Sequence, residues 1–203
     1  EVPAVRPADS AVRGGTLLSI RHPRLMSVPT RDEARVHGVV SRLIEALRTR
    51  TPGPIRLLCH DLRDLEFASS FTDVDYILPD DVHGYLQLLR EAALVVSFRL
   101  HAFVPCLSYG TPAVNISYDE RSMSLVRTLG FDAWDVNFVT SADPVAAVMD
   151  RCARLDEYTR LRAEARPRWE ALGATMRQAS SSFAEQVRRY REALEATRVG
   201  ERA

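Results

Sequence analysis

Apolar positions along the chain alternate between short unbroken runs and longer stripes at helical spacing. Unbroken apolar runs are typical of strands that are buried on both faces of a parallel sheet, and they occur here at residues 16–20, 55–59, 76–78, 93–98, 113–117 and 136–139. Stripes at three- and four-residue spacing predict helices between them, at residues 30–51, 82–92, 101–109, 122–129 and 144–154. Alternating strands and helices predict an α/β fold, a doubly wound Rossmann-like parallel sheet.

The same pattern divides the chain into three parts. Residues 1–15 are rich in proline and glycine and have no core pattern, so we interpret them as an arm or linker. Residues 16–160 form the predicted Rossmann-like domain, and residues 161–203 form a C-terminal helical extension. An apolar stripe runs along this extension and is typical of a packing surface; its members are Trp169, Leu172, Met176, Phe183, Val187, Tyr190 and Leu194.

Composition narrows the classes of function. The chain has 27 basic and 27 acidic residues, so it has no broad positive field for nucleic acid. Its three cysteines lie in apolar surroundings without C-x-x-C spacing, which predicts reduced thiols in a cytoplasmic protein. No run is long enough to span a bilayer. Without a G-x-G-x-x-G or Walker motif, and with Asp80 and Asp81 pointing apart, we expect no cofactor and no metal.

Charged residues follow the buried run 93–98 in an otherwise apolar stretch. Arg99 and His101 lie two residues apart, so an extended strand would point both side chains to one face. The carboxyl ends of parallel strands are where open α/β sheets bind ligands. A buried guanidinium needs an anionic partner, which leaves two alternatives: a structural pair such as Arg99 with Asp119, or a ligand anion beside His101.

Other strand ends supply further candidates. Arg21 follows the first strand and is either a second anion contact or a solvated loop arginine. His60 follows the second strand, where local hydrogen bonding is the simpler interpretation. The run 113–117 delivers Tyr118, Asp119 and Arg121 at its end.

Two motifs in this region resemble the polysaccharide pyruvyl transferase family. Its R-L-H signature is matched by Arg99, Leu100 and His101. Its G-x-P-x-x-x-x-x-Y-D-x-K segment is matched by Gly110, Pro112, Tyr118 and Asp119, with Arg121 where lysine is usual. Arginine keeps the positive charge but changes the donor geometry, and this chain contains no lysine at all.

The resemblance implies transfer of a pyruvyl group from phosphoenolpyruvate to a sugar of a surface polysaccharide, which can be lipid-linked. It also implies a cytoplasmic enzyme, peripheral at the inner membrane face, with no cofactor. In this interpretation His101 is the catalytic proton carrier. The substrate is held by Arg99, Arg21, Tyr118, Asp119 and Arg121.

The family resembles GT-B glycosyltransferases, which have two Rossmann-like domains, and this chain matches the C-terminal, donor-binding one. An N-terminal domain is therefore expected to be missing from this chain. Two alternatives stay open: a nucleotide-sugar-dependent glycosyltransferase half, with Glu120 on the ribose, or a non-catalytic partner-binding module. An exposed stripe on the C-terminal extension would favour self-association, that is, a homo-oligomer, which a sizing column would detect.

Overall fold

The computed structural model describes residues 14–26, 28, 30–51 and 53–200, with the side chains of residues 30, 31 and 193–200 left aside. Its centre is one six-stranded sheet in the order β3-β2-β1-β4-β5-β6, in which every paired neighbour is parallel. The strands are β1 (Thr16–Ser19), β2 (Ile55–Leu58), β3 (Asp75–Ile77), β4 (Leu94–Ser97), β5 (Ala113–Ser117) and β6 (Val136–Asn137). The predicted doubly wound α/β fold is confirmed.

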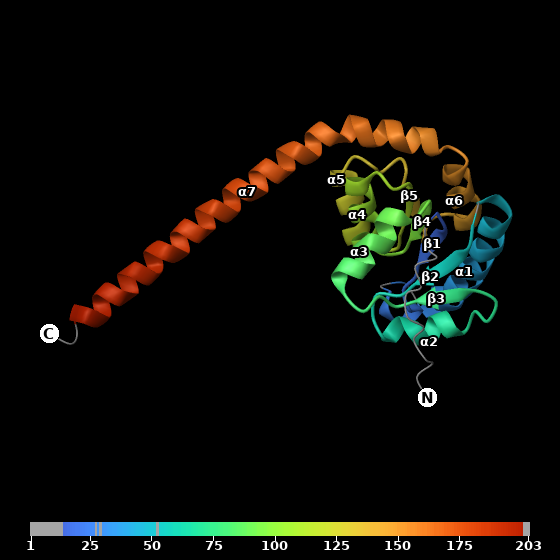
Figure 1. Ribbon diagram of the computed structural model, residues 1–203, viewed down its shortest axis with the longest axis horizontal. Helices are drawn as coiled ribbons and strands as arrows, with labels where there is room; N and C mark the ends of the chain where they lie inside the picture. Colours follow the sequence, from blue (N-terminus) through green and yellow to red (C-terminus); the bar gives the residue numbers. More distant parts are fainter. Residues whose placement is uncertain (1–13, 27, 29, 52, 201–203) are drawn as a thin grey trace. The chain divides into compact units, whose positions relative to one another are not determined.

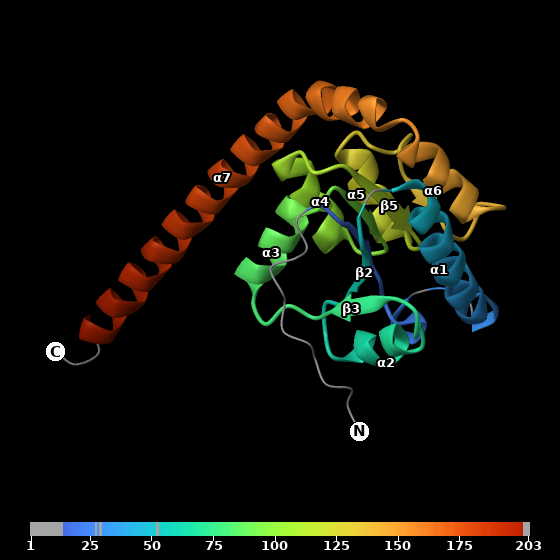
Figure 2. The same cartoon turned by 45° about the vertical axis from the view of Figure 1, so that its right-hand side comes forward.

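Helices cover both faces of the sheet. The first face carries α1 (Thr30–Arg50) and α6 (Pro144–Cys152), which contact each other, and the opposite face carries α3 (Val82–Glu91) and α4 (Leu100–Tyr109) (Figures 1 and 2). The remaining elements are the 3-10 helix η2 (Pro23–Leu25), α2 (Arg63–Ser69), α5 (Glu120–Thr128) and α7 (Leu155–Gly200). The acidic segment 62–75 has an irregular sequence pattern that leaves room for a short helix, and the structure has the helix α2 there.

The apolar runs become strands because both faces of the sheet are covered. Every residue of β1, β4 and β5 is buried, as expected for central strands of a parallel sheet. The stripe of α1, which includes Val40, Leu43 and Leu47, is buried against the sheet. Cys59 and Cys106 are also in this core, and burial raises the pKa of both thiols to about 12, which keeps them protonated.

Helix α4 is stopped by a glycine in the left-handed region. Gly110 has φ 79°, and its N–H donates to the carbonyl of Cys106. Glycine is the usual residue at such a helix end, because a residue with a side chain would be strained there. The first turns of α7 secure this end of α4. Tyr158 Oη donates to the carbonyl of Thr111 at 2.8 Å, and Arg162 Nε donates to that of Leu107 at 2.5 Å.

Replacing Gly110 by alanine is expected to lower the free energy of unfolding by about 1–2 kcal/mol. The cause is the left-handed backbone, and an added Cβ would also meet the Arg162 guanidinium at 3.4 Å. Gly38 is the matched control because it lies inside α1 with nothing within 4 Å of an added Cβ. Gly38→Ala should raise stability by about 0.5–1 kcal/mol in the same urea titration. If the free energy of unfolding changed in the same direction in both variants, the assignment of a left-handed backbone to the helix end at Gly110 would be contradicted.

The chain divides into two compact units, one ending at Ala163 and one beginning at Glu164. The second unit is the continuation of α7, and within it the side chains of Leu172, Met176, Phe183, Val187 and Tyr190 are exposed. Leu194 falls outside the described side chains. Among the described residues, no helix combines the length and apolarity that crossing a bilayer requires.

Candidate functional site

The carboxyl ends of four adjacent strands meet at one edge of the sheet. Strand β2 is followed by His60 and Asp61, β1 by Arg21, β4 by Arg99, and β5 by Tyr118. Because these strands are parallel neighbours, residues far apart in sequence are brought together here. The predicted gathering of charged residues at this edge is therefore present in the structure.

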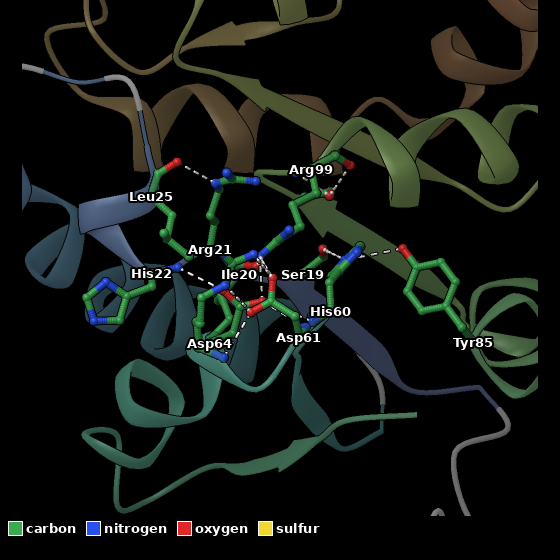
Figure 3. A network of polar contacts seen from close by, with 12 residues as sticks. Ser19, Ile20, Arg21, His22, Leu25, His60, Asp61, Asp64, Tyr85 and Arg99 are labelled. Atoms are coloured by element: carbon green, nitrogen blue, oxygen red, sulfur yellow. Dashed lines mark hydrogen bonds and ion pairs between the residues drawn. The ribbon is translucent and has the colours of Figure 1, made fainter. Parts of the chain in front are cut away.

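Arg99 is the most buried cation of this group, with 7% of its surface exposed. Its Nη2 donates to Asp64 Oδ2 at 2.5 Å, and its Nε donates to the carbonyl of Ile20 at 3.0 Å (Figure 3). Nη1 has no hydrogen-bond partner among the residues that the structure describes. The structure therefore pairs Arg99 with a protein carboxylate and leaves one nitrogen of the fork for another acceptor.

Asp64, in the first turn of α2, is fully buried and connects three strand ends. Besides Arg99, it accepts from the backbone N–H of His22 at 3.0 Å and of His60 at 3.0 Å. The sequence analysis missed Asp64. A signal was present, because Asp64 lies three and four residues before Phe67 and Ala68, which places it on the buried face of α2.

Two sequence-based expectations about this region need correction. Arg99 and His101 do not share one face of a strand, because β4 ends at Ser97 and the chain turns into α4 at Leu100. Arg99 therefore points into the ion pair, while His101 is exposed in the first turn of α4. The alternative partner Asp119 does not bind Arg99 either, since it caps α5 by accepting from the N–H of Ser122 at 2.7 Å.

His60 is held locally. Its Nε2 lies 2.8 Å from Ser19 Oγ and 3.2 Å from Tyr85 Oη (Figure 3). Burial, followed by the charge of nearby Arg99, lowers the pKa of His60 to about 3, so the imidazole is neutral near physiological pH. His60 is therefore a neutral structural group behind the site, which agrees with the simpler interpretation of its sequence position.

A pocket of about 620 Å³ opens in front of this network. Its polar side is formed by residues that the sequence singled out, namely Arg21, Arg99, His101, Tyr118, Asp119 and Arg121. Its apolar side comes from α4 and α5 and includes Val104, Pro105 and Leu125. The structure thus brings all six predicted site residues to one cavity.

Several polar groups at the pocket have no partner among the described residues. Arg21 uses Nε to donate to the carbonyl of Leu25 at 2.7 Å, while its two Nη atoms remain available. The hydroxyl of Tyr118 is also without a partner; burial raises the pKa of this phenol, and the charge of Arg21 acts against that rise. Arg121, by contrast, has a partner: it is exposed, and its Nη2 lies 3.4 Å from Asp119 Oδ2.

The pocket also faces the start of α4. The N-cap residue of this helix, Arg99, makes no capping hydrogen bond with its side chain, whereas the N-cap residues of α3, α5 and α6 are aspartates that do. Free N–H groups and the positive end of the helix dipole favour a bound anion. Together with Arg21 and Arg121, the start of α4 makes an arrangement suited to a small anion next to a histidine.

Among the described residues, no cluster of three or more His, Cys, Asp or Glu side chains could hold a metal.

The fold is shared with solved enzymes of the GT-B class. The chain aligns with UDP-GlcNAc 2-epimerase of Methanocaldococcus jannaschii at a TM-score of 0.52 and 12% identity, covering 72% of this chain and 39% of the epimerase. It aligns with O-GlcNAc transferase of Thermobaculum terrenum at a TM-score of 0.52 and 15% identity, covering 84% of this chain and 34% of the transferase. The chain therefore spans less than half of either protein, and the likeness defines the fold class.

The family comparison is more specific. The model of the polysaccharide pyruvyl transferase family matches residues 55–120, about a third of the chain. This range contains β2 to β5 with Asp64, Arg99 and His101, and it ends one residue after Asp119, so that Asp119 is included. The resemblance noticed in the R-L-H and Y-D motifs is thereby confirmed over that range. A search of curated proteins finds no match.

Proposed function

We propose that this chain forms the donor-binding half of a pyruvyl transferase that moves the pyruvyl group of phosphoenolpyruvate onto a saccharide of a surface polysaccharide. The observation that carries the proposal is the position of the R-L-H motif. It lies within the residues matched by the family model and forms the start of α4, at the wall of a pocket rimmed by arginines.

The donor chemistry agrees with the groups at the pocket. Phosphoenolpyruvate carries a carboxylate and a phosphate, and the planar fork of arginine suits both. Arg21 and Arg121 can reach such anions, because both have donor nitrogens open to the pocket. Arg99 adds positive charge from behind, with Nη1 as its one nitrogen without a protein acceptor. Tyr118 Oη supplies one more donor.

The reaction needs one proton delivered and two removed. Protonation of the enol methylene gives an oxocarbenium-like carbon, to which one acceptor hydroxyl adds. The C–O bond to phosphate then breaks, and the second hydroxyl takes the place of phosphate and closes the ketal. Of the two hydroxyl protons, one balances the proton given to the methylene and the other leaves with phosphate. A histidine suits such proton transfers near neutral pH. His101 is exposed at the pocket and makes no hydrogen bond to the described residues, so its ring is free to meet a substrate.

Titration of phosphoenolpyruvate into the chain by calorimetry tests the donor site. We expect saturable binding that weakens at least ten-fold in Arg21→Gln, since each charged hydrogen bond is worth about 1.5–3 kcal/mol. Arg24→Gln is the matched control, because Arg24 is an exposed neighbour outside the pocket lining. Arg99→Ala is unsuitable here, since it would leave Asp64 buried without its counter-charge.

A uridine diphosphate arm separates the two transferase interpretations. The structural neighbours include proteins named for UDP-GlcNAc and O-GlcNAc, so a nucleotide-sugar donor is the competing hypothesis. Binding of uridine diphosphate but not phosphoenolpyruvate would replace the pyruvyl donor by a nucleotide sugar. Loss of phosphoenolpyruvate binding in Arg24→Gln equal to that in Arg21→Gln would place the anion outside the pocket.

A further inference from the structure

The second unit of the chain exposes an apolar face along α7. Leu172, Met176, Phe183, Val187 and Tyr190 are between 37% and 70% exposed. At 3.6 residues per turn, these five positions fall within an arc of about 60°. They form one straight stripe, which we call the α7 apolar face. A contiguous exposed apolar face of this kind marks a surface that binds a protein or a membrane.

The charges around this face are sorted by sign. Arg168 lies about 40° beyond one edge of the α7 apolar face, and Arg191 and Arg177 lie about 40° and 80° beyond the other. None of the three makes an ion pair with a described residue. The opposite side of the helix carries Glu185 and Glu192.

The acids on that opposite side are already paired within the helix. Glu185 binds Arg188 at 2.6 Å and Arg189 at 2.9 Å, and Glu192 lies 4.0 Å from Arg188. Among the side chains that the structure describes in residues 168–191, the arginines without an ion pair therefore lie nearer the apolar face than the acids do. A partner that covers the face must be apolar in the middle and negatively charged at its borders.

An anionic lipid surface has that chemistry. Leucine, methionine, phenylalanine and tyrosine side chains can enter the boundary between headgroups and acyl chains, while arginines beside them reach lipid phosphates. Each basic residue near an anionic bilayer adds to the attraction. We propose that the segment 168–191 of α7 binds flat on an anionic membrane surface, with the α7 apolar face toward the lipid.

A second copy of the chain fits this face less well. When two helices pair along an apolar stripe, the residues that border one stripe meet those that border the other, and opposite charges there favour pairing. Within residues 168–191, the three arginines without an ion pair lie nearer the face than any acid does; Glu170, the nearest acid, lies about 100° beyond its edge and pairs with Arg166 at 3.0 Å. Self-pairing would therefore set arginine against arginine, which lipid phosphates would not.

Sedimentation of the full chain with lipid vesicles tests the proposal. Vesicles of phosphatidylcholine and phosphatidylglycerol in equal parts should pellet the protein, and vesicles of phosphatidylcholine alone should pellet far less. The variant R168Q/R177Q/R191Q should bind the anionic vesicles roughly 100-fold more weakly. Phe183→Ser with Tyr190→Ser should weaken binding at least ten-fold by removing buried aromatic surface.

The matched control is R188Q/R189Q, which removes charge from the paired side of the same helix and should bind almost as wild type does. Circular dichroism of each variant verifies that α7 remains helical. Equal loss in the two arginine variants, or equal binding to both kinds of vesicle, would overturn the proposal. So would failure of the wild type to bind anionic vesicles, or a dimer in light scattering that Phe183→Ser abolishes, since a second copy would then cover the face.

Discussion

Replacing Asp64 by alanine is expected to lower the free energy of unfolding by about 3–5 kcal/mol, because the Arg99 guanidinium would stay buried without its counter-charge. The change would also orphan the backbone N–H groups of His22 and His60, which donate to Asp64 in the folded protein. Urea denaturation followed by tryptophan fluorescence, to which the buried Trp134 contributes, measures the loss.

Asp73→Ala is the control for the removal of an ion-paired aspartate. Asp73 pairs with Arg48 at 2.5 Å, but its side chain is 64% exposed, so solvent screens the interaction. We expect little change in stability for this variant. If Asp64→Ala were as mild, Asp64 could not be the group that joins the strand ends.

Stability is expected to fall by about 2 kcal/mol between roughly pH 7 and pH 5 through His60 alone. In the unfolded chain His60 has its ordinary pKa of 6.5, whereas burial lowers the folded-state pKa to about 3. Between these values the unfolded state binds a proton that the folded state does not. The contribution of His60 is therefore complete above the unfolded pKa and is lost as the pH falls towards the folded pKa.

Urea titrations across this pH window isolate the effect by comparing wild type with His60→Gln. The variant should lose about 1.4 kcal/mol per pH unit less than wild type over the steepest part of the window. His83→Gln serves as the control, since His83 is an exposed residue of α3. A His60→Gln slope equal to that of wild type would mean that His60 takes up its proton in the folded protein.

Most of the fold could be predicted because its signals are local. The apolar runs at β4 and β5 and the stop at Gly110 depend on neighbouring residues, and the structure places these elements within one or two residues of the expected bounds. The short helix α2 was harder, because seven residues offer too little periodicity to separate a helix from a loop.

The residues that line the site could be predicted from the sequence, but the contacts between them and the rest of the chain could not. That Arg99, His101 and Tyr118 gather at one edge follows from the alternation of strands and helices. The partner of Arg99 does not follow from it, since Asp64 is 35 residues away and reaches Arg99 only because β1 alone separates β2 from β4 in the sheet. Likewise the expected common face of Arg99 and His101 failed because the strand ended two residues before Arg99.

The ion pair behind the pocket sets limits on how this scaffold can be altered. Asp64 and Arg99, which we call the floor behind the pocket, form a buried ion pair that stabilises the fold. Libraries that vary these two residues will therefore mostly return unfolded chains. The rim residues Arg21, His101 and Arg121 are half-buried or exposed and bind no strand end through their charged tips. Directed evolution toward other anionic donors should therefore randomise the rim and keep the floor fixed.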